Sequence, residues 1–413
     1  MAVLKGNAVV GQAGGPTVVI NQSLVGVIQE VQKHPQIETL LGARHGVRGV
    51  IEDNFIDLKR QPTEMLEIVA RTPASALGAT RDKPNEEYCA KIFEGFRKHN
   101  VRYFFYIGGN DSAQTANIVN KIAQREKYDL QVVHVPKTID NDLLVTDHCP
   151  GFGSAAKFVA SAFIGDNLDN RALPGVKINV LMGREAGFIT AASILARRRE
   201  DDGPHLIYLP ERPFVLERFY EDVAAVVSKY GRCLVAVSEG IRDTDGTHWA
   251  TKLAKQVEKD SFGNVQLSAG AGALGEFLAG MLKQKLPQIK RVRADTYGYL
   301  QRSFPGCTSE VDAWEARLVG QMAVSYAVGA GGKDGSVALV RLPGTSYAVG
   351  TEFVALDRVA PSKPPFTKGV PCEYISPSGN YITDKFLSYV QPLVGELPKV
   401  GWFEQIHTES TWG

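Results

Sequence analysis

The sequence PKTIDND at residues 136–142 follows the apolar run VVHV at residues 132–135. The run has the composition of a buried strand, so the polar stretch would lie at that strand's carboxyl end. Asp140 and Asp142 stand two residues apart there, beside Lys137 and a threonine. One carboxylate can accept a proton, the other can face a metal ion, and the lysine can neutralise a phosphate. Taken alone, the stretch could equally be a polar loop without a chemical role.

The bulk composition is that of a large globular enzyme. The chain has 413 residues, 44% of them hydrophobic and 22% charged, with a formal net charge of +1. This length predicts two or three domains, or one bilobal enzyme. The near-neutral charge argues against a nucleic-acid binder, and no apolar stretch approaches the ~20 residues of a membrane helix. The five cysteines are widely spaced without a CxxC pair, and no secretory signal is visible, so we expect reduced thiols in a cytoplasm.

Apolar runs alternate with longer helical patterns along the chain, which favours an α/β architecture with a largely parallel sheet. Several of these runs end in polar or glycine-rich segments: GQAGGPT at 11–17, GGNDS at 108–112, MGR at 182–184 and SEG at 238–240. Ligands of open parallel sheets bind beyond the carboxyl ends of the strands, so the segments predict one convergent cleft.

The glycine turns at 11–17 and 108–112 both run into helical patterns. Glycines let the backbone approach a ligand, and the free N–H groups at a helix start favour phosphate. Asp111 or Ser112 could cap the second of these helices. Neither turn matches the Walker or dinucleotide fingerprint, and each alone could be only a tight connection.

Three other segments carry structural expectations. The small residues at 268–275 favour a close helix contact over chemistry. Residues 330–336 have the pattern of a turn before a strand at 337–342. The tail beyond about residue 361 is rich in proline and aromatic residues, and could be an irregular cap over the body or a subunit contact.

The motifs GGNDS, PKTIDND, MGR and SEG, together with YGYLQRS at 297–303, occur in the order and approximate spacing of the phosphofructokinases. The chain resembles that family over roughly residues 5–345. The resemblance implies an α/β fold of two Rossmann-like lobes with largely parallel sheets, and an active site in the cleft between them. Residues 1–151 with about 302–345 would form the phosphoryl-donor lobe, 152–301 the fructose 6-phosphate lobe, and 346–413 a C-terminal extension of unknown role.

Two positions resemble the pyrophosphate-dependent members of that family. ATP-using members carry GGDGS, and usually glycine before TIDND, whereas this chain has Asp111 and Lys137. A carboxylate at Asp111 would lie where the α-phosphate of ATP needs room. Two unit charges ~4 Å apart repel by about 4 kcal/mol at an effective dielectric near 20, on the order of a thousandfold in affinity. Lys137 would supply a point charge at the phosphoryl group in transfer.

The resemblance therefore implies reversible transfer of a phosphoryl group from pyrophosphate to the 1-hydroxyl of fructose 6-phosphate. Asp140 would be the general base, with Lys137 and Asp111 as the other catalytic positions. Asn110, Asp111 and Asp142 would hold Mg²⁺, although Asn110 replaces the aspartate of the common family pattern. The implied pyrophosphate contacts are Gly14, Gly15, Arg81, Gly109 and Lys137. The implied sugar-phosphate contacts are Thr138, Asp140, Met182, Gly183, Arg184, Glu239, Arg293, Tyr299 and Arg302.

Arg293 matches the position from which family members lend an arginine to a neighbouring subunit, so the resemblance implies a homodimer with shared sites. Tyr299 stands where ATP-using members have histidine. Two alternatives are an ATP-dependent phosphofructokinase, against which Asp111 and Lys137 argue, and a non-catalytic regulatory subunit, against which the intact Asp140 and Asp142 argue. A lipid or NAD kinase would lack the sugar-binding arginines and the motif at 297–303. Neither nucleic acid nor membrane is expected as a partner.

Overall fold

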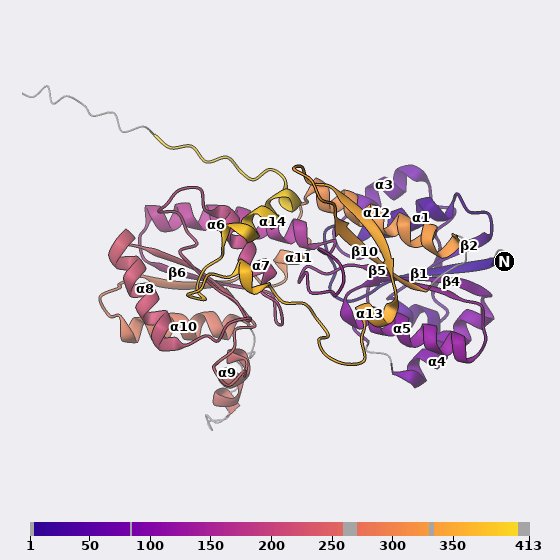
Figure 1. The fold of residues 1–413 in the computed structure, drawn as a ribbon, viewed down its shortest axis with the longest axis horizontal. Helices are drawn as coiled ribbons and strands as arrows, with labels where there is room; N and C mark the ends of the chain where they lie inside the picture. Colours follow the sequence, from indigo (N-terminus) through magenta and orange to yellow (C-terminus); the bar gives the residue numbers. More distant parts are fainter. Residues whose placement is uncertain (1–3, 83–84, 259–270, 330–333, 404–413) are drawn as a thin grey trace, which may run out of the picture.

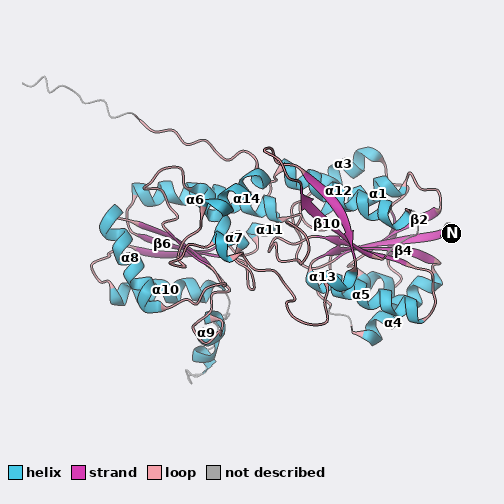
Figure 2. Cartoon of the chain, viewed as in Figure 1, coloured by secondary structure: helices cyan, strands magenta, loops and turns pink. Residues whose placement is uncertain are grey.

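The computed structural model describes residues 4–82, 85–258, 271–329 and 334–403. Two β-sheets lie side by side along the long axis of the molecule, each with helices on both faces (Figure 1). Figure 2 shows the same arrangement coloured by secondary structure. The predicted α/β architecture with two largely parallel sheets is therefore confirmed. Within the described ranges, no helix combines the length and the apolar character needed to cross a bilayer.

The larger sheet has the strand order β11-β10-β5-β4-β1-β2-β3. Its inner strands are parallel, and the edge strands β3 and β11 run antiparallel to their neighbours. The strands are β1 (Gly6–Gln12), β2 (Ile37–Ala43), β3 (Phe55–Asp57), β4 (Val101–Gly108), β5 (Gln131–Pro136), β10 (Gly335–Arg341) and β11 (Val349–Val354). The predicted strands at 132–135 and 337–342 correspond to β5 and β10.

Both faces of this sheet are buried, which explains why its central strands are apolar at consecutive positions. In β1, Ala8 and Val10 face one hydrophobic cluster and Val9 faces the other. The first cluster includes α1 (Ile20–Val31), α3 (Thr63–Arg71) and α12 (Glu310–Val328). The second includes α2 (Val47–Ile51), α4 (Glu86–Lys98) and α5 (Asn110–Arg125).

The smaller sheet is wholly parallel, with the order β7-β8-β6-β9. Its strands are β6 (Val176–Leu181), β7 (Leu206–Tyr208), β8 (Cys233–Ser238) and β9 (Val292–Thr296). One face is covered by α6 (Phe152–Ala172), α7 (Phe188–Ala191), η1 (Ala192–Ala196) and α14 (Asp384–Val394). The other carries α8 (Leu216–Tyr230), α9 (Trp249–Glu258) and α10 (Ala271–Lys285).

Gly275, in α10, tests the prediction that the small-residue segment 268–275 makes a close helix contact. A Cβ on Gly275 would lie 3.2 Å from both Ala294 Cβ and Val180 Cγ2. The predicted close helix contact is thus confirmed at Gly275, whereas 268–270 lie outside the described residues. The predicted turn at 330–336 also falls largely outside them, at 330–333.

The C-terminal segment after residue 345 contacts both sheets. β11 pairs with β10, and α13 (Leu356–Val359) packs on α5. The non-helical residues 361–371, here named the strap, then run from α13 toward the smaller sheet (Figure 1). Beyond the strap, η2 (Cys372–Tyr374) and α14 pack together, and α14 contacts α6 and η1. The described part of the tail packs on the body and is partly helical rather than irregular, whereas the other possibility, a subunit contact, stays a prediction.

Candidate functional site

The polar strand exits converge on one cavity of about 420 Å³. Its lining comes from the segments after β1, β4 and β5 of the larger sheet, the segment after β6 of the smaller sheet, and α11 (Leu300–Ser303). The predicted residues that line it are Gly14, Gly15, Arg81, Gly109, Asn110, Asp111, Lys137, Thr138, Asp140, Asp142, Met182, Arg184 and Arg302. The predicted convergence is therefore found for the segments after β1, β4, β5 and β6, whereas no residue of the predicted segment 238–240 lines the cavity.

The glycine turn after β1 brings backbone and cationic side chains together. Gly14 has a φ of +71°, in the left-handed region that glycine adopts without strain. A Cβ on Gly15 would lie 2.2 Å from Nη1 of Arg302, so a side chain there would displace this guanidinium. The Gly15 carbonyl accepts a 2.7 Å hydrogen bond from Nζ of Lys137. Gly14 N–H donates to the Thr80 carbonyl, which places Arg81 beside the turn.

The turn after β4 leads directly into α5, which begins at Asn110. The N-cap is Gly109 and it makes no side-chain cap bond, so the expectation that Asp111 or Ser112 caps the helix is wrong. Asp111 and Ser112 instead lie in the first turn. The first backbone N–H groups of a helix lack partners within it, and here they lie at the cavity wall where an anion would be favoured.

Lys137 is buried, with 2% of its surface exposed, in the cavity wall. Burial lowers the pKa of its ammonium to about 8, and the positive charges of Arg302 and Arg81 lower it further, while Asp140 and Asp142 oppose them. A cation in such a position costs free energy unless an anion offsets it. The buried Lys137 ammonium, with Arg81 and Arg302 in the same lining, thus offers positive charge to a small anion.

Asp140 is half-buried and its backbone N–H donates to Oγ1 of Thr138 over 3.1 Å. Burial raises the pKa of its carboxyl, against the opposing effects of Lys137, Arg302 and Arg184. A carboxylate with a raised pKa, facing a cavity, is poised to accept a proton from a substrate hydroxyl.

Asn110 and Asp142 form a pair that could hold a metal ion. Nδ2 of Asn110 donates to Oδ2 of Asp142 over 2.8 Å, and the remaining oxygens, Asn110 Oδ1 and Asp142 Oδ1, are buried without hydrogen-bond partners. Burial, and then the charge of Asp140, raises the pKa of Asp142 to about 7. No group of three His, Cys, Asp or Glu residues suited to a metal is found among the described residues. Mg²⁺ does not require one, because it commonly binds one or two carboxylates together with substrate phosphates and water.

Four predicted residues do not line the cavity: Gly183, Glu239, Arg293 and Tyr299. Glu239 lies near it, since Asp140, Arg184 and Arg302 all affect the pKa of its carboxyl, which burial raises. Tyr299 is 69% exposed, and its ring lies 4.1 Å from the guanidinium carbon of Arg302. Arg293 is exposed on the edge strand β9, beside a separate cavity of about 250 Å³. Within one chain, Arg293 therefore does not contribute to the main cavity.

Sequence reasoning missed several lining residues: Ala13, Thr80, Asp82, Tyr106, Thr115 and Ile139. Thr115 could have been found by helical spacing, because it follows Asp111 by one turn and its hydroxyl donates to the Asp111 carbonyl. Asp82 is held by Arg48 and by the hydroxyl of Tyr88, each at 2.7 Å. No pattern in the sequence indicates that arrangement.

Comparison with known proteins agrees with this geometry. The phosphofructokinase family model matches residues 7–327. The chain is 53% identical over 393 residues to the pyrophosphate–fructose 6-phosphate 1-phosphotransferase of Rhodospirillum rubrum, covering 95% of each chain. It also resembles the crystal structures of pyrophosphate-dependent phosphofructokinases from Marinobacter aquaeolei (TM-score 0.81, 34% identity, 97% and 94% of the two chains) and Nitrosospira multiformis (TM-score 0.82, 31% identity, 97% and 95%).

Proposed function

The chain belongs to the phosphofructokinase family, and we propose that it transfers a phosphoryl group from pyrophosphate to the 1-hydroxyl of fructose 6-phosphate. The products are fructose 1,6-bisphosphate and phosphate, and the transfer is reversible. The observation that carries the choice of donor is Lys137, a buried ammonium at the junction of the glycine turn and the two aspartates. It offers charge to a donor that has no nucleoside to bind.

Pyrophosphate binds at the end of the cavity formed by Gly14, Gly15, Gly109 and Arg81. Backbone N–H groups at the start of α5 and the charges of Arg81 and Lys137 offset the charge of the donor. As the transferred group separates from the leaving phosphate, the fixed Lys137 ammonium stabilises the developing charge without reorganisation. A side chain at position 15 would displace the Arg302 guanidinium from its place beside the glycine turn.

Fructose 6-phosphate binds at the side of the cavity that Met182, Arg184 and Arg302 line. Guanidinium groups suit the 6-phosphate because their forked donors match phosphate oxygens. Asp140 accepts the proton of the 1-hydroxyl as that oxygen attacks the phosphorus, and Thr138 orients the loop through its bond to the Asp140 N–H. Glu239, beside Arg184, accepts hydrogen bonds from the sugar.

We place Mg²⁺ at Asn110 Oδ1 and Asp142 Oδ1, with Asp111 in the same turn of the cavity wall. When bound, the metal would neutralise charge on the phosphates. The unpartnered oxygens support this placement, because a buried carboxylate oxygen without a donor is costly unless a cation offsets it.

Several broader assignments form part of the proposal. Residues 1–151 with about 302–345 form the donor lobe and 152–301 the sugar lobe, and the extension from 346 contributes β11 to the donor sheet. The active unit is a homodimer in which Arg293 reaches the neighbouring site, consistent with its exposure on an edge strand. The enzyme acts in the cytoplasm.

The deciding experiment is aldolase-coupled detection of fructose 1,6-bisphosphate formed from fructose 6-phosphate and Mg²⁺, with pyrophosphate and with ATP in parallel. Activity with pyrophosphate alone is the expected result. Activity with ATP alone would leave the assignment of Asp140 as the base intact, but would overturn the choice of pyrophosphate as the donor. No activity with either donor would favour a regulatory subunit of the same fold.

A further inference from the structure

Lys368, in the strap, binds three main-chain carbonyls of the segment that follows Asp140. Its backbone N–H donates to the Asp142 carbonyl over 2.8 Å. Its ammonium donates to the carbonyls of Thr146 and Asp147, both over 2.7 Å. One side chain and its own amide therefore span the segment from 142 to 147, and Lys368 does not line the cavity itself.

The same segment is fixed by a second residue of the C-terminal extension. Asn141, between the two site aspartates, is fully buried and has a φ of 56°. Its Nδ2 donates to the hydroxyl of Tyr389 over 2.8 Å, and that hydroxyl donates to the Asp147 carbonyl over 3.0 Å. Oδ1 of Asn141 accepts from the Cys149 N–H. A left-handed backbone at a non-glycine residue persists only where its surroundings hold it. Here both the nitrogen and the oxygen of the Asn141 side-chain amide are hydrogen-bonded.

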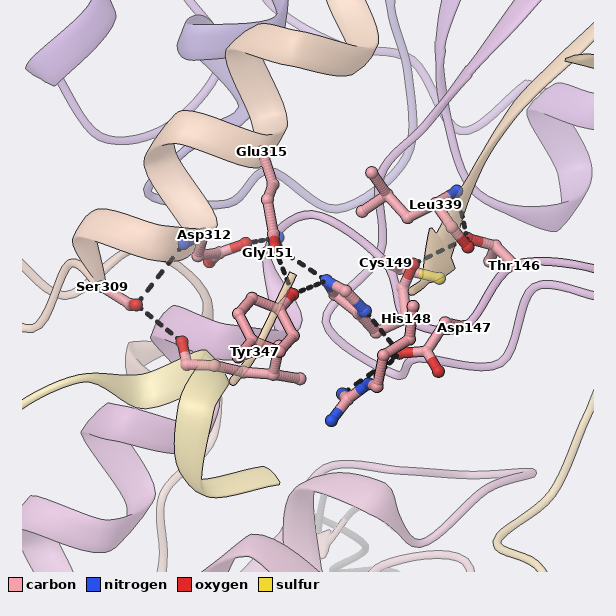
Figure 3. Close-up of polar contacts among 12 residues, drawn as sticks. Thr146, Asp147, His148, Cys149, Gly151, Ser309, Asp312, Glu315, Leu339 and Tyr347 are labelled. Carbon is pink, nitrogen blue, oxygen red and sulfur yellow. Dashed lines mark hydrogen bonds and ion pairs between the residues drawn. The ribbon is translucent and has the colours of Figure 1, made fainter. Parts of the chain in front are cut away.

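The far end of the segment has its own anchors, independent of Lys368 (Figure 3). His148 lies between Asp147 and Glu315, with a 2.7 Å contact on each ring nitrogen. Asp312 accepts from the Gly151 N–H over 2.7 Å. These contacts fix residues 147–151 against α12. Nearer the two aspartates, Asn110 binds the Asp142 side chain, and the Asp147 N–H donates to the Leu339 carbonyl of β10. Lys368 adds its bonds to the main-chain carbonyls of this stretch, and Tyr389 adds its bond to the Asn141 side chain.

The strap continues from Lys368 to the sugar side of the cavity. The Val370 N–H donates to Oε1 of Glu211 over 2.8 Å, and the same oxygen accepts from the Gly187 N–H over 2.9 Å. Gly187 lies three residues after Arg184. The strap thus joins the segment carrying Asp140 to the segment carrying Arg184, although these belong to different sheets.

We propose that Lys368 is a positioning residue for the Asp140–Asp142 segment, which it holds against the sugar side of the cavity with Tyr389 as its companion. The inference rests on the proposed function, because that function makes Asp140 the general base that Lys368 would position. Loss of the ammonium removes a donor from the Thr146 carbonyl and leaves the Asp147 carbonyl with the Tyr389 hydroxyl, which loosens the segment. Small displacements of a reacting group reduce rates sharply, up to about a hundredfold for ~1 Å.

The test compares Lys368→Met, which keeps the length of the side chain, with Lys363→Met on an exposed lysine of the same strap. We expect kcat of Lys368→Met to fall roughly tenfold to a hundredfold. KM for either substrate should change by less than about threefold, because the phosphate-binding arginines are untouched. Lys363→Met should match the wild type. A kcat of Lys368→Met within about twofold of the wild type would overturn the proposal.

Amide hydrogen exchange supplies a readout that needs no substrate. Residues 141–147 should exchange faster in Lys368→Met and in Tyr389→Phe, while α12 and β5 stay as protected as in the wild type. Unchanged exchange at 141–147, or acceleration throughout the chain, would refute a local positioning role. If the wild type shows no activity with pyrophosphate, the proposed function fails, whereas the exchange data still decide whether Lys368 orders this segment.

Discussion

The low pKa of Lys137 predicts an alkaline limit to activity. Only the ammonium can stabilise the transferred phosphoryl group, and burial with the nearby arginines places its pKa at about 8. Roughly 90% of the free enzyme is then protonated at pH 7 and roughly 10% at pH 9. We therefore expect kcat/KM for pyrophosphate to fall by roughly tenfold between these pH values, since kcat/KM reports groups of the free enzyme.

The assay is the aldolase-coupled reaction over this pH range, with Mg²⁺ in excess so that pyrophosphate remains in its metal complex. A matched measurement uses Lys137→Arg, whose guanidinium does not titrate below about pH 12. Whatever its absolute rate, this variant should lose the alkaline decline. A wild-type pH profile that is flat to pH 9, or the same decline in Lys137→Arg, would refute the assignment of the alkaline decline to Lys137.

Three further predictions follow from the same geometry. Asp140→Asn should lower kcat by about 10²–10⁴ with an unchanged melting temperature, because it removes the base but keeps the shape of the side chain; a loss under about tenfold would exclude that role. The double variant Asp111→Gly with Lys137→Gly should have a kcat/KM for ATP at least about fivefold above that of the wild type. The expected gain is small because solvent screens the exposed Asp111 and reduces its repulsion of the ATP α-phosphate toward about 1 kcal/mol. No gain in kcat/KM for ATP would contradict this account of donor choice. Phe386→Ala in α14, where the ring is fully buried, should lower the free energy of unfolding by about 3–5 kcal/mol in urea titrations, whereas Lys385→Ala on the exposed side should change it little; equal effects would contradict the packing of α14.

The sequence predicted the parts of the site that depend on the ends of strands. Lys137 and Asp140 follow β5 directly, and Gly109 and Asp111 follow β4. Parallel neighbouring strands bring such exits to one edge, so local pattern and topology together were sufficient. The start of α5 was less accurate, because a glycine N-cap leaves no side-chain signal and the helix begins two residues earlier than the capping residues indicated.

Residues that reach the cavity without lying in a motif could not be predicted in this way. Tyr106 lies in β4, where an aromatic residue is expected to belong to the core. It is buried there, and it also lines the cavity. Asp82 depends on Arg48, which lies 34 residues before it in the chain. Arg293 was predicted to serve the site of a neighbouring subunit, and it lines a separate cavity of its own chain, so that role stays a prediction.

The largest gap concerns the C-terminal extension, and it has a physical cause. The motif at 136–142 identifies Asp140, but the backbone around Asp140 is fixed by Tyr389, 248 residues from Asn141, and by Lys368, 222 residues from Thr146. A lysine or tyrosine in a proline-rich tail has no periodicity that marks such contacts. The partners of Lys368 are main-chain carbonyls, which every residue has, so the recognised segment carries no complementary sequence signal either. The chemistry of this site is therefore encoded locally, whereas its geometry depends on a segment that only the folded chain brings to it.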